Sequence, residues 1–358
     1  MPARIAAFDG VRGTAVLLIL ALHSGYGPHF LGGGLGIEIF FVLSGYLIST
    51  LLIQERERWG SVSLSSFYLR RIARLAPALV LTLVAAGMAY RLLPDGTFAA
   101  YAGAVAAVVT YTANIAVSLR WSNLDGLGHT WSLAEEEQFY LLWPVILMFL
   151  LRLRRQRWAI ALVVLGVAAS WASLVLHHGP SIDGIPQAYF RPDSRAGSLL
   201  LGGLLALVVR DLRVRRVLAA HLTGVLSLVA LVGVIIAAGR TRLDFLNECV
   251  PLAALASMLL IGHLSQRETS VPARLFSVAP LRWVGQISYG AYLYSGLFNA
   301  ATDRWMADWS TPAIALIRTL AAVALAAVSY YLVEQPIRVR AGAVIAQRRE
   351  RLHALSAA

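Results

Sequence analysis

The chain is poor in cysteine and in charge. It has one cysteine, only 14% of its 358 residues are charged, and all 31 basic side chains are arginine. The single cysteine, Cys249, excludes an internal disulfide and a cluster of thiolate metal ligands. The arginines lie in short clusters between apolar segments, which disfavours a nucleic-acid partner. There is no long polar segment, so we expect no appended soluble domain.

Common catalytic signatures are also missing. The sequence has no G-x-S-x-G, no H-E-x-x-H and no Walker loop. We therefore expect no metal site and no permanently bound cofactor. Apolar residues, in contrast, make up 58% of the chain, and the mean hydropathy is +0.67. This composition is typical of a polytopic membrane protein rather than a soluble all-helical one.

The apolar residues gather into segments that could enter a membrane. The segments are 13–26, 35–53, 75–93, 100–118, 138–151, 158–176, 196–209, 217–238, 248–264, 284–301 and 312–333. Arginine clusters are expected on the cytoplasmic side, and the clusters here alternate correctly if segment 100–118 is re-entrant. We predict an all-α membrane helical bundle of about ten transmembrane helices plus one possible re-entrant segment, with both termini cytoplasmic. The domain would cover 1–340 and a cytoplasmic tail 341–358.

The first apolar helix carries an arginine and a histidine in the run DGVRGTAVLLILALH at 9–23. Arg12 and His23 are eleven residues apart, which is close to three helical turns, so they share one face about 16 Å apart. Polar groups on an apolar helix are expected to face a protein interior. Histidine is the natural general base near neutral pH, and Arg12 at the cytoplasmic mouth could bind an anion. Alternatively, His23 only packs between helices and Arg12 only extends its charged end to the membrane surface.

The run FYLRRIARLAP at 67–77 places three arginines where a helix enters the membrane from the cytoplasm. Arg71 and Arg74 are three residues apart and share a face, beside Arg70. Guanidinium groups so arranged suit a phosphate or pyrophosphate. The alternative is charge that sets topology and contacts lipid headgroups.

The run GHTWSLAEEEQFYLLWP at 128–144 clusters polar groups at a membrane boundary. Ser132 fits a capping box with a glutamate three residues later, and acidic residues suit a first helical turn. Glu136 and Glu137 exceed what capping needs, so either could hold His23 or His129 in a useful tautomer.

Two further polar groups are expected toward the outer side. Glu38 lies early in the segment GIEIFFVLSGYLI and should have a partner there. Arg191, Asp193 and Arg195 precede segment 196–209, as a local ion-pair cluster or as a site that touches a polar acceptor.

Together these motifs resemble those of the acyltransferase-3 family of integral membrane acyltransferases. The resemblance covers nearly the whole chain and adds ISYGAYLY and VEQP near its end. It implies a bacterial inner-membrane enzyme that transfers an acyl group, usually acetyl, from cytoplasmic acyl-CoA to a hydroxyl of an envelope glycan or glycolipid. Some members acylate macrolides or other secreted small molecules. The expected partners are thus acyl-CoA, a sugar or glycolipid acceptor and membrane lipids.

By resemblance, Arg12 and His23 map onto the family's essential pair, and Arg71 and Arg74 onto its arginine pair near the CoA entrance. His23 would deprotonate the acceptor hydroxyl or briefly take the acyl group. Two positions depart from the family: Glu38 stands where aspartate is common, and Ser295 where histidine is common. A transporter and a scaffold subunit are the competing functions, although we find no inverted repeat.

Overall fold

The structure is a computed structural model that describes residues 5–24, 28–91, 98–121, 124, 126–177, 181–182, 185–240, 246–297 and 311–357. The first half contains α1 (Ala6–His23), η1 (Pro28–Leu35), α2 (Gly36–Trp59), α3 (Leu64–Arg91), α4 (Phe98–Val109), α5 (Ala113–Ser118), η2 (Gly128–Thr130), α6 (Trp131–Leu150) and α7 (Gln156–Leu176). A short antiparallel pair, β1 (Ser181–Ile182) and β2 (Ile185–Pro186), and η3 (Gln187–Phe190) follow.

The second half is also helical. It contains α8 (Pro192–Val208), α9 (Leu212–Ala219), α10 (His221–Arg240), α11 (Leu246–Gln266), α12 (Val271–Phe276), α13 (Ala279–Gln286), α14 (Ser288–Tyr294), α16 (Thr311–Ser329), the π-helical turn η5 (Tyr330–Glu334) and α17 (Gln335–Ala357). Helix α17 continues through position 340, and the predicted role of its end as a cytoplasmic tail stays a prediction.

Among the described residues, seven stretches of helix are long and apolar enough to cross a membrane. They are Ala6–His23, Gly32–Trp59, Leu64–Met88, Gln156–Leu176, His221–Gly239, Glu248–Gln266 and Pro312–Gln347. The prediction of an all-α membrane bundle is therefore confirmed. Helix α6 is 20 residues long, but it carries three consecutive glutamates and is not among the seven. The number of ten crossings stays a prediction.

Two predicted segments are broken into shorter helices. Segment 100–118 forms α4 and α5, of 12 and 6 residues, which meet at a turn where Tyr111 has φ 53°. Neither helix is long enough to cross a bilayer by itself. The expectation of one helix over 284–301 is wrong, because α13 ends at Gln286 and α14 begins at Ser288. Residues 298–301 of that segment lie outside the described part.

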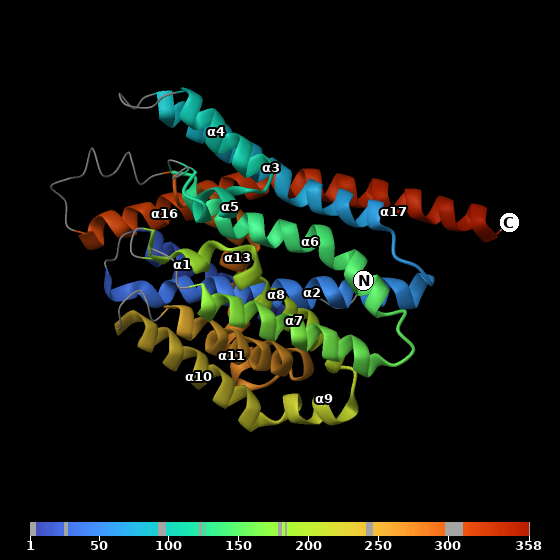
Figure 1. Cartoon of the computed structure of the whole chain (residues 1–358). Helices are drawn as coiled ribbons and strands as arrows, with labels where there is room; N and C mark the ends of the chain where they lie inside the picture. Colours follow the sequence, from blue (N-terminus) through green and yellow to red (C-terminus); the bar gives the residue numbers. More distant parts are fainter. Residues whose placement is uncertain are drawn as a thin grey trace.

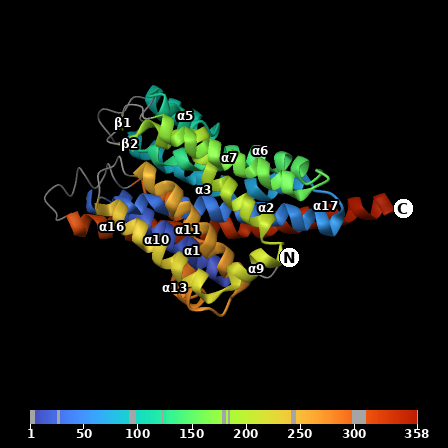
Figure 2. The ribbon, with the colours of Figure 1, turned by 60° about the horizontal axis from the view of Figure 1, so that its bottom comes forward.

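Figure 1 shows α3, α4 and α17 along one side of the molecule and α10 with α11 along the other, with α1, α2 and α8 between them. The start of α1 and the end of α17 lie toward the same side in Figures 1 and 2. We call this the inner end of the bundle, where α2 ends at Trp59, and the opposite end the outer end, where α1 ends at His23. The names follow the predicted topology.

Glycines let the central helices pack backbone against backbone. A Cβ atom on Gly13 of α1 would lie 2.1 Å from the carbonyl oxygen of Leu281 in α13. A Cβ atom on Gly45 of α2 would lie 2.0 Å from the carbonyl oxygen of Leu199 in α8. No other residue fits at such distances, so these two glycine seams fix α1 against α13 and α2 against α8.

Candidate active site

Two neighbouring cavities follow α1 from the inner end of the bundle. The inner cavity has a volume of about 590 Å³, and its lining includes Thr50 and Gln54 of α2. The deeper cavity, of about 80 Å³, has polar lining from Arg12, Ser44, Arg71, Arg74, Ser132, Glu136, Tyr140, Ser288, Tyr289 and Tyr292. Arg12, Arg74, Ser288 and Tyr289 line both. The shared residues make one polar lining from the inner end into the middle of the bundle, and the break between α13 and α14 contributes to it.

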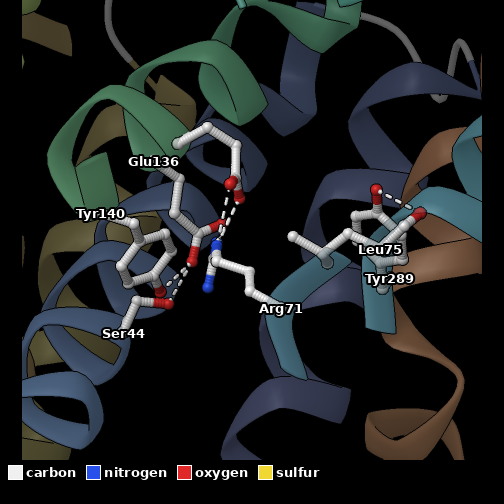
Figure 3. A network of polar contacts seen from close by, with 7 residues as sticks. Ser44, Arg71, Leu75, Glu136, Tyr140 and Tyr289 are labelled. Carbon is white, nitrogen blue, oxygen red and sulfur yellow. Dashed lines mark hydrogen bonds and ion pairs between the residues drawn. The ribbon is translucent and has the colours of Figure 1, made fainter. Parts of the chain in front are cut away.

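Helix α6 supplies adjacent carboxylates to the deeper cavity and its wall. Glu137 accepts hydrogen bonds from Arg71 Nε, at 2.9 and 2.8 Å to its two oxygens, and also pairs with Arg71 Nη2. Glu136 accepts from the hydroxyl of Tyr140 at 2.6 Å and from Ser44. Figure 3 shows Arg71 reaching from α3 toward this group, and its guanidinium carbon lies 3.2 Å from the centroid of the Tyr140 ring. The network therefore joins α2, α3 and α6 beside the cavity.

The structure divides the predicted arginine cluster. Arg71 and Arg74 both line the deeper cavity, as their shared helical face predicts. Arg70 pairs with Glu55 of α2, with 3.3 Å between Nη2 and the carboxylate, and lines neither cavity. Arg12 lies 3.9 Å from Asp9 and faces both cavities. Three guanidinium groups therefore meet around one space, an arrangement that suits an anionic ligand.

The two histidines of the predicted site lie beside one residue of the deeper cavity, Tyr292. Tyr292 lines the cavity, and its ring centroid lies 6.0 Å from that of His23 and 5.6 Å from that of His129. The two imidazole rings lie 5.8 Å apart in an edge-on arrangement. His23 Nδ1 lies 2.9 Å from the hydroxyl oxygen of Ser295, and His129 Nε2 donates to the Leu293 carbonyl at 3.0 Å. Arg12 therefore lies in the lining of both cavities, whereas His23 and His129 line neither and lie beside Tyr292.

The predicted capping box on α6 is wrong. The helix begins at Trp131, and its N-cap residue, Thr130, makes no side-chain cap. Ser132 lies inside the first turn, where its hydroxyl is 2.6 Å from that of Tyr292, which also donates to the His129 carbonyl. The serine thus connects α6 to α14 instead of ending the helix.

The predicted outer group falls into two separate ion pairs. Glu38 and Arg195 pair with each other at zero side-chain exposure, and Ser198 also donates to Glu38. Neither Glu38 nor Arg195 lines the two cavities. This pair clamps α2 to α8, and its predicted role in acceptor binding stays a prediction.

Arg191 and Asp193 form the other pair, at 3.1 Å on the surface at the start of α8. Burial raises the pKa of Asp193, but hydrogen bonds from Arg191 and Ser173 outweigh burial and hold this pKa below its usual range. Asp193 is therefore ionised across the neutral range.

Several polar residues of the site were not predicted from the sequence. Tyr140 stands four residues after Glu136, a spacing that predicts contact on one helix face. Ser44 was not among the predicted site residues, because a lone serine within an apolar segment carries no signal, yet its hydroxyl contacts Glu136. Thr50 and Gln54 carried no signal, because their side chains matter only where α2 borders the inner cavity. Within the described residues, no group of three His, Cys, Asp or Glu could hold a metal ion.

A family model described as an acyltransferase domain matches residues 5–333. This range contains the three arginines of the deeper cavity, the two neighbouring histidines and the α6 carboxylates. The chain belongs to the acyltransferase-3 family. Its membrane-spanning helices and the polar lining along α1 are therefore those of a membrane acyltransferase.

The chain is also similar to named acyltransferases. The O-acetyltransferase OatA of Staphylococcus aureus strain NCTC 8325 / PS 47 is 30% identical over 353 residues, which is 94% of this chain and 58% of the relative. OatA of strain COL matches with the same identity and coverage. The chain thus spans about 58% of the length of the curated relatives it matches. No solved structure matches it.

Proposed function

We propose that this acyltransferase is an O-acetyltransferase that moves an acetyl group from cytoplasmic acetyl-CoA to a hydroxyl of an envelope glycan, glycolipid or related sugar. The observation that carries the proposal is the polar lining that begins at the inner end and includes Tyr292, whose ring centroid lies 6.0 Å from that of His23. The name of the OatA relatives supports acetyl as the group and oxygen as the acceptor atom.

The inner cavity is the proposed donor site. Arg12 and Arg74 provide positive charge for the phosphates of CoA, with Arg71 deeper along the wall. The Thr50 hydroxyl and the Gln54 amide oxygen are buried side-chain atoms without a hydrogen-bond partner among the described residues, and both residues line this cavity. Unpartnered buried acceptors are costly, so amide N–H groups of a pantetheine arm would stabilise them.

His23 is the proposed general base. Its imidazole takes the proton of the acceptor hydroxyl while the hydroxyl oxygen attacks the thioester carbonyl carbon. The C–S bond then breaks, and the departing CoA thiolate recovers the proton from the imidazolium, so protons and electrons balance. The polar groups act in a site away from bulk water, where their electrostatic effect is strongest.

The remaining predicted residues support this chemistry from a distance. Glu137 holds Arg71 in place and Glu136 holds Ser44, so the α6 carboxylates position the donor side of the cavity. On the outer side, the exposed Arg191 and Asp193 are available to sugar hydroxyls. We propose the bacterial inner membrane as the location, with both termini in the cytoplasm.

The test is acetyl-CoA turnover by the purified protein in lipid nanodiscs. Acceptor probes are soluble muropeptides, a polyprenyl-linked sugar and a macrolide. We expect CoA release that depends on a sugar probe, and a loss of about 100-fold or more in His23→Ala. CoA release with the macrolide but with neither sugar probe would show that the acceptor is a secreted small molecule and not a sugar. No CoA release from folded wild-type protein, at any acyl length, combined with solute uptake by the same protein in sealed liposomes, would favour the transporter instead.

A separate variant in the same assay tests the donor site. Gln54→Leu is expected to raise the KM for acetyl-CoA about fivefold to tenfold and to leave kcat unchanged, because one hydrogen bond to the donor is lost. Gln266→Leu is the matched control, since Gln266 contacts Arg215 and lies outside both cavity linings. An unchanged KM in Gln54→Leu would exclude the inner cavity as the place where this part of the donor binds.

A further inference from the structure

The hydroxyl of Ser295 makes two hydrogen bonds beside the proposed base. Ser295 follows α14 directly and is buried, with 5% of its surface exposed. Its oxygen lies 2.9 Å from His23 Nδ1 and 2.7 Å from the carbonyl oxygen of Tyr292. The contact joins α14 to the last residue of α1, across 272 positions of the sequence.

The chemistry of these groups assigns the protons. A carbonyl oxygen only accepts, so the hydroxyl proton of Ser295 is used in the bond to Tyr292. The serine oxygen must then accept from His23, which places a proton on Nδ1. A neutral imidazole has one N–H, so the other nitrogen, Nε2, keeps its lone pair.

We propose that Ser295 is a positioning residue that holds His23 in the tautomer protonated at Nδ1, with Nε2 as the basic atom. The inference rests on the proposed function, since it assigns the atom of His23 that takes the proton of the acceptor hydroxyl. Ser295 itself touches neither substrate, and its effect on the reaction passes through the histidine.

The same hydrogen bond also stabilises the imidazolium form of His23 that arises during the reaction. When Nε2 accepts the proton of the acceptor hydroxyl, the imidazolium still donates from Nδ1 to the serine oxygen. This hydrogen bond becomes stronger because its donor is now charged. This is the role that a carboxylate has in a catalytic triad, performed here by a weaker, neutral acceptor. No proton moves to Ser295, and the proton on Nε2 leaves with the CoA thiolate.

The neighbouring residues of α14 keep Ser295 at this position. Tyr292 is fixed through Ser132 of α6, at 2.6 Å between the hydroxyls, and Tyr294 donates to Ser329 of α16 at 2.8 Å. Ser295 thus closely follows two tyrosines that are hydrogen-bonded to other helices, and these bonds restrain the position of the orienting hydroxyl.

The experiment compares Ser295→Ala, Ser295→Thr and His23→Ala in the full chain in nanodiscs. Ser295→Ala is expected to lower kcat about 10- to 100-fold, with the KM for acetyl-CoA within about twofold of wild type. Ser295→Thr keeps the hydroxyl and should restore kcat to within about threefold. Ser227→Ala is the matched control, because Ser227 is also buried and also bonds the carbonyl three residues earlier, in α10.

A spectroscopic readout tests the tautomer without any acceptor. In protein with 15N-labelled histidine, with the His23 signals assigned by their loss in His23→Ala, we expect Nδ1 at the protonated position and Nε2 at the unprotonated one. Ser295→Ala should change this pattern, and Ser295→Thr should keep it.

Three outcomes would overturn the inference, and they can be told apart. A proton on Nε2 in wild type, or full kcat in Ser295→Ala beside an inactive His23→Ala, removes the role of Ser295 and leaves the proposed function intact. An acetyl group found on Ser295 after a brief reaction would make it a nucleophile. Full activity in His23→Ala would instead remove the base on which both proposals depend.

Discussion

Two ion pairs of the same chemistry serve different ends in this molecule. Arg71 and Glu137 join α3 to α6, and their side chains keep 12% and 10% of their surface exposed. Arg195 and Glu38 join α8 to α2 at zero exposure. Arg71 lines the deeper cavity, whereas Arg195 is covered by packing, with its guanidinium carbon 4.3 Å from the centroid of the Tyr189 ring.

The difference lies in what each arginine can contact next. A guanidinium group beside a cavity can exchange part of its bonding to the protein for an incoming anion at small cost. A guanidinium group sealed in the interior can only hold its present partner, because separating the two charges leaves both desolvated. Arg71 is therefore suited to a binding site and Arg195 to a clamp between helices.

Breaking the sealed pair is expected to have the largest effect. Arg195→Leu leaves Glu38 buried without its counter-charge and should lower the free energy of unfolding by about 3–5 kcal/mol. The measurement is thermal unfolding of the protein in detergent micelles. The double variant Glu38→Leu/Arg195→Leu should recover most of that loss, since no charge stays buried alone. A single variant as stable as wild type would show that the pair is not a clamp.

Breaking the pair beside the cavity should cost activity more than stability. Arg71→Leu is expected to reduce acetyl-CoA turnover about 100-fold, and to destabilise the fold less than Arg195→Leu, because the side chain of Glu137 keeps 10% of its surface exposed whereas Glu38 keeps none. Arg210→Leu serves as the control, since Arg210 pairs with Glu57 on the surface. An equal loss of stability in Arg71→Leu and Arg195→Leu would contradict the distinction between a binding arginine and a clamping arginine.

The exposed pair at the start of α8 should have the smallest effect on stability. Asp193→Asn is expected to change the free energy of unfolding by less than about 1 kcal/mol, as for other surface pairs. Because folding lowers the pKa of Asp193, its contribution is fully present above the unfolded-state value of about 3.9 and is lost as pH falls through the lower folded value. Unfolding midpoints of wild type and Asp193→Asn at pH 7 and pH 3 should therefore converge at the acid end.

Helical periodicity predicted the parts of the site that one helix contains. It placed Arg12 and His23 on one face of α1 and Arg71 beside Arg74 on α3, and the structure shows all four on the helices expected. Composition predicted the membrane bundle for the same reason, since hydropathy is a local property.

What could not be predicted depends on which helices pack together. Glu38 and Arg195 are 157 positions apart, and no local pattern tells that α2 lies along α8. A carboxylate of α6 was considered as a group that could hold His23 or His129, whereas the structure places the hydroxyl of Ser295 2.9 Å from His23 Nδ1, a contact that only the fold creates. The break between α13 and α14 was missed as well, because the polar residues Gln286 and Ser288 on either side of Ile287 do not end the apolar run of segment 284–301.

The glycine seams along α1 and α2 have a consequence for what can cross this protein. Two backbones in direct contact leave no layer of side chains between the helices, so we expect the central helices to act as a stationary partition. A carrier must open such a partition to each side in turn, whereas an enzyme needs only a narrow meeting point inside it. If acetyl-CoA and the acceptor approach from opposite faces of the membrane, each stays on its own side. Only the acetyl group then crosses the membrane.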